Sequence, residues 1–540
     1  MAAAVRRKPP LNRLPSPRSF LLPRRTRPRL RAAVGALLLA AGPALLAPPA
    51  ALAQSAHLPA LGDEVSQDFG VGAERRLGDR IMVEIRRDPD YLDDPLLLDY
   101  VRSIWQPLLD AARVRGDLSA ELDERFAWEA FLVRDRSVNA FALPGGYTGV
   151  HLGLIGMTAT RDELASVLAH ELSHVTQRHI ARNMSRSRQQ SLVAMASMIV
   201  GVLAASRSPD AANAVITGGQ ALAVQGQLNF SRDMEREADR IGFGLLQQAG
   251  FAPTGMASMF ERLQQASRHN DSNAFPYLRT HPLTSERIGE ARSRLGVEPG
   301  ARTGAALEHA VMQARARVLM DSRPDALQRW QRPGGAPAED AAGRLLAAAA
   351  QAQASVLLRD WVQADEALAR ARQLAAPEPR ALRAVALLQV QAHLARGETA
   401  QAERALAPWR MDGSRTTELL AAQIGVGTRP PADPARLKRT AEDLQTWLSA
   451  HPRDSSAWAL LGQAWERLDQ PVRSVRAQAE ARYVLGDLQG AIDRLRAAQR
   501  LAQGSASSDH IEASVVDARL RAVESEWRQR QRDEAAGQNG

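Results

Sequence analysis

The sequence predicts an α+β fold that is mostly α-helical, with one small β-sheet in the first third of the chain. Strand patterns are confined to residues 127–133, 138–143 and 147–152, with a glycine turn at Gly145 and Gly146. Helical periodicity surrounds this segment, and no strand pattern follows residue 304. At 540 residues the chain is long enough for about three domains. Its abundance of alanine favours helix.

Residues 67–115 are predicted to be helical. Apolar residues recur there three or four positions apart, so that one face of the helix is apolar. This face is formed by Leu97, Leu98, Tyr100, Val101, Ile104, Trp105 and Leu108.

The first 53 residues have the three parts of a secretory signal peptide. A basic stretch ends at Arg31, an apolar stretch runs from Ala32 to Leu46, and Ala51-Leu52-Ala53 has the small residues that a signal peptidase cleaves after. The alternative is an uncleaved membrane anchor, but the apolar stretch is short for a span of about 20 residues. We therefore expect cleavage after Ala53.

The net charge of +9 belongs to this leader. Residues 1–53 hold ten of the 69 basic residues and none of the 60 acidic ones, which leaves 59 basic and 60 acidic residues. The near-neutral remainder removes the electrostatic argument for nucleic-acid binding. The chain has no cysteine, which excludes disulfides, thiolate metal ligands and a lipid-modified cysteine.

The helix after the strands carries His170-Glu171-Leu172-Ser173-His174. Thr160 as N-cap and Glu163 three positions later form a capping box that predicts where this helix begins. Histidines four residues apart project from one face, so both ring nitrogens can bind one metal ion, and Glu171 can hold a water beside it. The pattern predicts zinc-dependent peptide hydrolysis, with zinc acidifying a water and the glutamate accepting its proton.

The third metal ligand has to come from another part of the chain. A metzincin would need a glycine and a histidine where Gln177 and Ile180 stand, so that class is excluded. His179 lies five residues after His174 and is expected to face elsewhere, either on the surface or behind the ligands.

An acidic segment further along offers a carboxylate instead. Glu235 and Asp239 are four residues apart on a predicted helix over 217–249, so Glu235 can bind zinc while Asp239 orients a ligand histidine. Glu237 is the competing ligand, and a solvated helix face is the alternative without any metal. The apolar segment 192–205, about 14 residues long, is too short to cross a bilayer and is predicted to be a buried helix or a lid.

Helical pairs with short turns are predicted from residue 304 almost to the end. Alanine and leucine recur at Ala364, Ala402 and Ala491 in similar surroundings, and turn glycines Gly397 and Gly486 precede the last two. A period near 34 residues is typical of tetratricopeptide-like repeats, which stack into a curved protein-binding solenoid. The alternative is a generic alanine-rich helical bundle.

Together, the motifs over residues 65–300 resemble the gluzincin peptidases of the HtpX and CAAX-prenyl endopeptidase family. The resemblance rests on His170-Glu171-x-x-His174, Glu235-x-x-Ala238-Asp239, His281-Pro282-Leu283 and Arg287. It implies a helical zincin-type domain that holds one Zn²⁺. It also implies that the two histidines and Glu235 bind this ion.

The same resemblance implies roles for two further residues. Glu171 would act as the base and His281 would stabilise the transition state. A sharper hypothesis is that His281 occupies the fourth zinc position and keeps the resting enzyme latent. The sequence lacks the long apolar spans of the membrane-embedded members of the family.

The whole chain is accordingly predicted to have a signal peptide over 1–53, a metallopeptidase domain over 54–303 and a repeat domain over 304–535. This organisation is similar to members of the family that act in the periplasm on outer-membrane β-barrel proteins. It implies misassembled outer-membrane proteins as substrates and docking on their assembly machinery, with peripheral membrane contact left open. The alternative function is a repeat-based chaperone or adaptor with latent protease activity.

Overall fold

A computed structural model describes most of the chain beyond the leader. The predicted signal peptide, the apolar segment 192–205 and residues 217–230 lie outside the described residues. No helix among the described residues combines the length and the hydropathy that a membrane span needs. The described residues are 70–186, 231–268, 275–295, 307–332, 338, 340–427, 433–504 and 510–538.

A four-stranded mixed sheet has the strand order β1-β2-β4-β3. β2 runs parallel to β4, whereas β1 and β3 pair antiparallel with their neighbours, so β3 is an edge strand. The three strands predicted around the glycine turn are confirmed, and Gly145 and Gly146 have φ of 78° and 86° there. The strands are β1 Tyr91–Leu92, β2 Glu129–Val133, β3 Ala140–Leu143 and β4 Tyr147–His151.

The predicted helix over 67–115 is two helices, α2 (Val71–Arg87) and α3 (Pro95–Arg115), separated by β1. The prediction of one helical stretch was wrong at Tyr91, which pairs with Val133 of β2. Asp88, Pro89 and Asp90 end α2 before this point, because proline interrupts helical hydrogen bonding. The apolar face predicted for 97–108 is confirmed, since all seven of its residues are buried.

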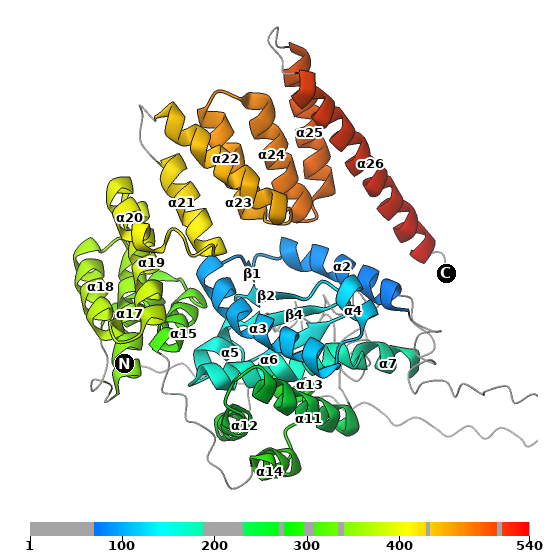
Figure 1. The fold of residues 1–540 in the computed structure, drawn as a ribbon, viewed down its shortest axis with the longest axis vertical. Helices are drawn as coiled ribbons and strands as arrows, with labels where there is room; N and C mark the ends of the chain where they lie inside the picture. The colour runs from blue at the N-terminus through cyan, green and yellow to red at the C-terminus, as the bar shows by residue number, and fades with distance from the viewer. Residues whose placement is uncertain are drawn as a thin grey trace, which may run out of the picture. The chain divides into compact units, whose positions relative to one another are not determined.

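The sheet lies between helices on its two faces (Figure 1). Side chains of α2 pack with Phe131 and Tyr147 on one face. Ala140 and Val150 on the other face join the large core that contains residues of α3 and α6 (Arg161–Thr176). The other helices of this part are α4 Ala120–Arg125, α5 Leu152–Met157, α7 His179–Arg186, α11 Arg232–Gln248, α12 Thr254–Ser267, α13 Pro276–Thr280 and α14 Ser285–Arg294.

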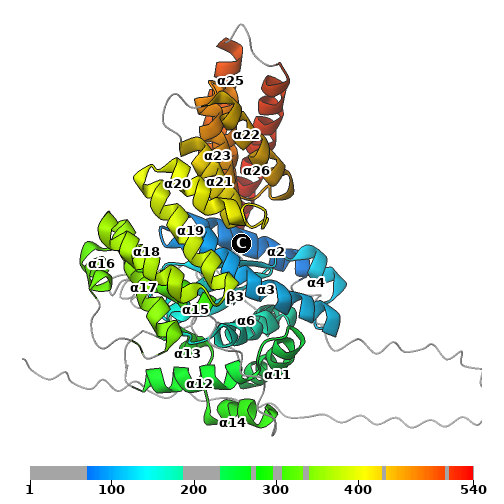
Figure 2. The same cartoon turned by 60° about the vertical axis from the view of Figure 1, so that its left-hand side comes forward.

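From residue 307 onward the described chain is helical, and neighbouring helices pack in sequence order (Figure 2). The two predicted turn glycines are confirmed, with φ of 77° at Gly397 and 80° at Gly486. Ala364, Ala402 and Ala491 are buried between helices. The helices are α15 Leu307–Leu319, α16 Pro324–Gln331, α17 Ala341–Leu357, α18 Trp361–Ala375, α19 Pro379–Arg396, α20 Thr399–Leu406, the 3₁₀ turn η1 Ala407–Trp409, α21 Arg415–Gly427, α22 Pro434–Ala450, α23 Ser455–Arg467, α24 Pro471–Val484, α25 Leu488–Gly504 and α26 His510–Gln538.

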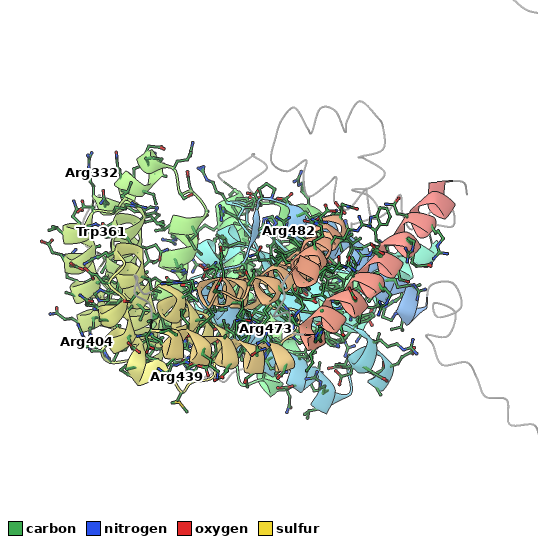
Figure 3. The ribbon with its side chains drawn as sticks, turned by 90° about the horizontal axis from the view of Figure 1, so that it is seen from above. Arg332, Trp361, Arg404, Arg439, Arg473 and Arg482 are labelled. Carbon is green, nitrogen blue, oxygen red and sulfur yellow. The ribbon has the colours of Figure 1, made fainter. Side chains whose placement is uncertain are left out.

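The surface of these helices carries basic side chains at several separate points. Figure 3 labels Arg404 of α20, Arg439 of α22 and Arg482 of α24, which lie apart from one another. These labelled cations therefore do not gather at one helix.

Helix α21 contacts α3 and the residues just before it, and the buried side chain of Arg415 lies at this contact. Arg415 at the start of α21 pairs with Asp93 at 2.6 Å and with Asp454 at 2.8 Å. Asp99 of α3 accepts a hydrogen bond from the backbone N–H of Thr416 at 2.9 Å. We call these five residues the α3 junction.

Candidate metal centre

Helix α6 carries the His-Glu-x-x-His motif through the core. It begins as predicted, because the Thr160 hydroxyl accepts a hydrogen bond from the Glu163 backbone N–H at 3.1 Å. The Glu163 carboxylate accepts from the Ala159 N–H, one residue before the expected position. His170, Glu171 and His174 are all buried.

Helix α11 brings the acidic residues to α6. The Ser231 hydroxyl caps its start by accepting from the Met234 backbone N–H. Glu235 and Asp239 lie one turn apart and are both buried. Gly242 permits close contact between the helices, since a Cβ there would lie 3.2 Å from the His170 backbone nitrogen.

His281 follows the short helix α13 and completes the cluster. Its backbone N–H donates to the Tyr277 carbonyl at 2.8 Å, and the two rings stack with centroids 4.7 Å apart. The Tyr277 N–H in turn donates to the Val138 carbonyl just before β3. The His281 loop is thus held between the sheet and α6.

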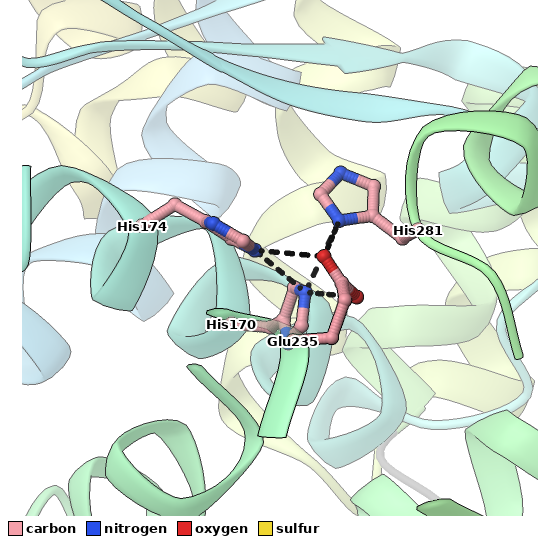
Figure 4. A group of neighbouring side chains, drawn as sticks. All are labelled: His170, His174, Glu235 and His281. Atoms are coloured by element: carbon pink, nitrogen blue, oxygen red, sulfur yellow. Dashed lines mark hydrogen bonds and ion pairs between the residues drawn. The ribbon is translucent and has the colours of Figure 1, made fainter. Parts of the chain in front are cut away.

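Four side chains converge on one point, namely His170, His174, Glu235 and His281 (Figure 4). His170 Nε2 lies 3.0 Å from His174 Nε2 and 3.3 Å from His281 Nδ1. Glu235 Oε1 lies 3.0 Å from His281 Nδ1 and 3.4 Å from His174 Nε2. The predicted ligands and His281 are therefore brought together.

This donor set fits a zinc ion. Imidazole nitrogens and a carboxylate are ordinary zinc ligands, and zinc binds them at about 2.0–2.2 Å. Two ligands held tetrahedrally at that distance lie roughly 3.3 Å apart, close to the separations found here. With no cysteine in the chain, an N/O site of this kind is the zinc chemistry available.

Asp239 and Arg287 hold the cluster from behind. Asp239 Oδ1 lies 2.9 Å from His170 Nδ1, which turns Nε2 toward the other ligands. Arg287 donates to both Asp239 oxygens and pairs with Glu235 Oε2 at 2.8 Å. Burial alone would lower the pKa of His170, but hydrogen bonds to Asp239 and Glu235 raise it to about 9. The carboxylates therefore favour positive charge at this centre.

Glu171 lies beside the cluster with both of its carboxylate oxygens buried. Among the described residues, no side chain donates a hydrogen bond to either oxygen, and the backbone of Ala142 lies close enough to lower the pKa of this carboxyl. His281 Nε2 lies 3.5 Å from Oε1. Burial raises the pKa of Glu171, and the charges of His281 and His170 oppose this rise. A buried carboxylate with free lone pairs is well suited to receive a proton.

His179 takes one of the two positions that the sequence left open. It is buried, and its Nδ1 lies 2.8 Å from Nδ1 of His174, so a surface position is wrong and a place behind the ligands is confirmed. The turn after α6 contains Arg178, where φ is 50°, and α7 begins at the next residue. Glu237, the competing ligand, contacts His179 and lies outside the four-residue cluster.

Comparison with known proteins agrees with this geometry. Residues 101–295 match the model of peptidase family M48. The β-barrel assembly-enhancing protease of Escherichia coli (strain K12) is 35% identical over 245 residues, which cover 45% of this chain and 48% of that protein. The same-named protease of Yersinia pestis is 29% identical over 473 residues, which cover 86% and 90%.

A mitochondrial protein matches this chain over a shorter stretch. The mitochondrial metalloendopeptidase OMA1 of Schizosaccharomyces pombe is 37% identical over 161 residues, which cover 30% of this chain and 44% of that protein. The chain thus spans about half the length of the E. coli relative it matches. The family and the names of these relatives support a zinc metalloendopeptidase. Residues 101–295 are thus similar to peptidase family M48, and the chain resembles the β-barrel assembly-enhancing proteases.

Proposed function

We propose that this chain is a zinc-dependent endopeptidase with chaperone-like activity, which degrades misassembled outer-membrane β-barrel proteins or assists their assembly. The observation that carries the proposal is the convergence of His170, His174 and Glu235 beside Glu171, whose buried carboxylate accepts no side-chain hydrogen bond among the described residues. A structural cluster would pair a buried glutamate, whereas a hydrolytic site leaves it open for a water.

The chemistry divides between the metal and the chain. A zinc ion held by His170, His174 and Glu235 supplies a Lewis acid that polarises the scissile carbonyl and acidifies water. Glu171 accepts the proton of the attacking water and delivers it to the leaving amine. Asp239 keeps His170 in the tautomer that binds metal. His281 or a neighbouring donor would stabilise the developing oxyanion with a hydrogen bond.

The substrate is proposed to bind as a β-strand along the predicted strand region 138–152. β3 is an edge strand of the sheet and packs against α6, which supports this position for an extended peptide. Pairing through the main chain depends little on side chains, so it suits unfolded or misassembled proteins.

The decisive experiment replaces Glu171 by glutamine and measures hydrolysis of an unfolded protein such as casein. Loss of the base lowers the rate about 10³-fold, while the variant retains one zinc per chain. A chelator abolishes wild-type hydrolysis, and added zinc restores it. Glu261→Gln, an exposed glutamate paired with Arg292, is the matched control and keeps full activity. Wild-type rates in Glu171→Gln would end the proposal.

His281 is proposed to cap the metal in a latent resting enzyme, with oxyanion donation as its alternative role. The support is that its Nδ1 faces the ligands while its Nε2 faces Glu171. The variant His281→Ala separates the two roles. Higher basal proteolysis supports the cap, and lost proteolysis supports the donor alone.

The remaining chain is proposed to locate and present clients. The organisation comprises a leader over 1–53 for export to the periplasm, a catalytic domain over 54–303 and tetratricopeptide-like repeats over 304–535. The helical pairs from α15 onward and the names of the relatives support this, with the outer-membrane assembly machinery as the proposed docking partner and peripheral membrane contact left open.

The alternative function is a chaperone or adaptor with only latent protease activity. The helical pairs support this function as well as they support the presentation of clients to a protease. Expressing Glu171→Gln in cells that lack the protein distinguishes them. If the inactive protein restores outer-membrane assembly fully, chaperoning dominates. If assembly stays defective, proteolysis is required.

A further inference from the structure

His174 has a chain of polar contacts behind it. Its Nδ1 lies 2.8 Å from His179 Nδ1, and His179 Nε2 lies 3.0 Å from Glu237 Oε2. Arg182 donates to the same Glu237 oxygen at 2.9 Å. His179 is fully buried, whereas the Glu237 side chain is 31% exposed. The contacts therefore lead from the metal centre to the surface of α11.

A specific backbone turn builds this arrangement. α6 ends at Thr176, and Arg178 adopts a positive φ of 50°, which is unfavourable for a residue other than glycine. Arg178 donates to Glu74 of α2 at 3.0 Å, which holds the turn in place. The turn places His179 at the start of α7, where its ring faces His174 with centroids 4.8 Å apart.

The contacts define how protons are arranged when a metal is bound. His174 Nε2 faces the other ligands, so its proton must be on Nδ1, which donates to His179 Nδ1. His179 then carries its own proton on Nε2 and donates to the Glu237 carboxylate. Each ring is neutral, and the negative charge is at the outer end of the chain of contacts.

We propose that His179 and Glu237 are positioning residues that fix the tautomer and orientation of His174 for zinc, as Asp239 does for His170. This inference rests on the proposed function, because it concerns the same metal centre. The two ligand histidines are supported differently. His170 meets a buried carboxylate directly, whereas His174 meets a carboxylate through a second histidine. Both arrangements increase the basicity of the ligand nitrogen.

The zinc dissociation constant of the purified full chain tests the proposal, measured by competition with a chromophoric chelator. Replacing His179 by leucine removes the acceptor and weakens zinc binding about 10–100-fold. The variant His179→Asn places an oxygen near the position of Nδ1 and loses less affinity. Glu237→Gln, which keeps the shape but removes the charge, also loses less. Asp239→Asn is the reference for the equivalent loss at His170.

Cobalt substitution adds a readout that a purely structural role would not change. The visible absorption bands of Co²⁺ depend on ligand geometry, so they shift in His179→Leu and Glu237→Gln. Asp233→Asn is the matched control, because Asp233 lies one turn before Glu237 on α11 and is largely exposed. This control keeps the wild-type affinity and spectrum.

Unchanged zinc affinity and an unchanged cobalt spectrum in both His179→Asn and Glu237→Gln would overturn the inference, even if His179→Leu fails to fold. That result would leave the proposed function intact if Glu171→Gln still binds zinc without hydrolysing casein. A wild-type chain that binds no zinc would overturn both.

Discussion

The metal centre and the α3 junction both bury charge, but they compensate it differently. At the junction, Arg415 makes two hydrogen bonds to Asp93 and two to Asp454. The hydroxyl of Ser456 donates to Asp93 as well. In the metal centre, by contrast, several lone pairs converge on one point, and neither oxygen of Glu171 accepts a side-chain hydrogen bond among the described residues.

This difference indicates that the charges of the α3 junction stabilise the structure, whereas those of the metal centre bind a ligand. Ions that are fully paired and hydrogen-bonded hold one arrangement of two elements, and removing one partner leaves the other uncompensated. Converging lone pairs are costly unless a cation joins them, so their presence in a folded core indicates a ligand.

Breaking the junction is expected to have the largest effect on stability. Arg415→Met leaves the buried Asp454 and the partly buried Asp93 without their main partner and destabilises the local structure by about 3 kcal/mol. This estimate is at the lower end for buried pairs, because Asp454 keeps hydrogen bonds from Trp447 and Ala457. Hydrogen exchange of the α21 amides is expected to accelerate about 100-fold.

A matched arginine in the same region provides the control. Arg410 also pairs with two carboxylates, Glu418 and Asp443, but it is 36% exposed. Arg410→Met is expected to change stability by less than about 1 kcal/mol. Equal acceleration of exchange in the two variants would contradict a special role for the buried pair.

Removing a ligand tests the metal centre. Glu235→Gln is expected to weaken zinc binding by at least about 100-fold, or about 2.7 kcal/mol. A direct ligand is lost in this variant, and that loss should exceed the roughly 10–100-fold loss that follows when only a partner of a ligand is replaced. The loss of zinc affinity in Glu237→Gln is expected to be at least tenfold smaller than the loss in Glu235→Gln. Competition with a chelator measures both, and a larger loss in the Glu237 variant would reverse the assignment of the ligand.

The sequence predicted the parts of the centre that depend on local spacing. Histidines four residues apart and the pair Glu235 and Asp239 share a helix face whatever the rest of the fold does. The three strands around Gly145 were also predictable, because alternation and a glycine turn are local patterns. The roles assigned to these residues stay predictions until the variants are measured.

Features that depend on distant contacts cannot be predicted from local sequence patterns. β1 is two residues long and exists because Tyr91 pairs with Val133, 42 positions away. The position of His179 depends on the turn at Arg178, which Glu74 holds from 104 positions away. The spacing of five residues after His174 was visible, but helical geometry alone turns such a residue away from its neighbour.

A smaller effect is expected where α3 meets α15. His309 is buried there, with its Nδ1 2.6 Å from the Tyr100 hydroxyl and its Nε2 2.9 Å from the Thr158 carbonyl. Burial lowers the pKa of His309 below its usual 6.5, although the hydrogen bond to the Thr158 backbone and the charge of Glu163 both act to raise it. The neutral ring fits this site because Nε2 donates to the carbonyl while Nδ1 accepts from the hydroxyl.

Lowering the pH should therefore destabilise this contact. The unfolded chain takes up a proton at His309 as the pH falls through about 6.5, while the native chain resists it, so the stabilisation is complete above 6.5 and declines below. The cost reaches about 1.4 kcal/mol at pH 5.5 if the native ring stays neutral. Melting temperatures of the wild type and His309→Gln between pH 7.5 and 5.5 measure it, since other titrating groups are common to both. The wild type should lose stability more steeply, and parallel curves would show that His309 accepts a proton in the folded chain.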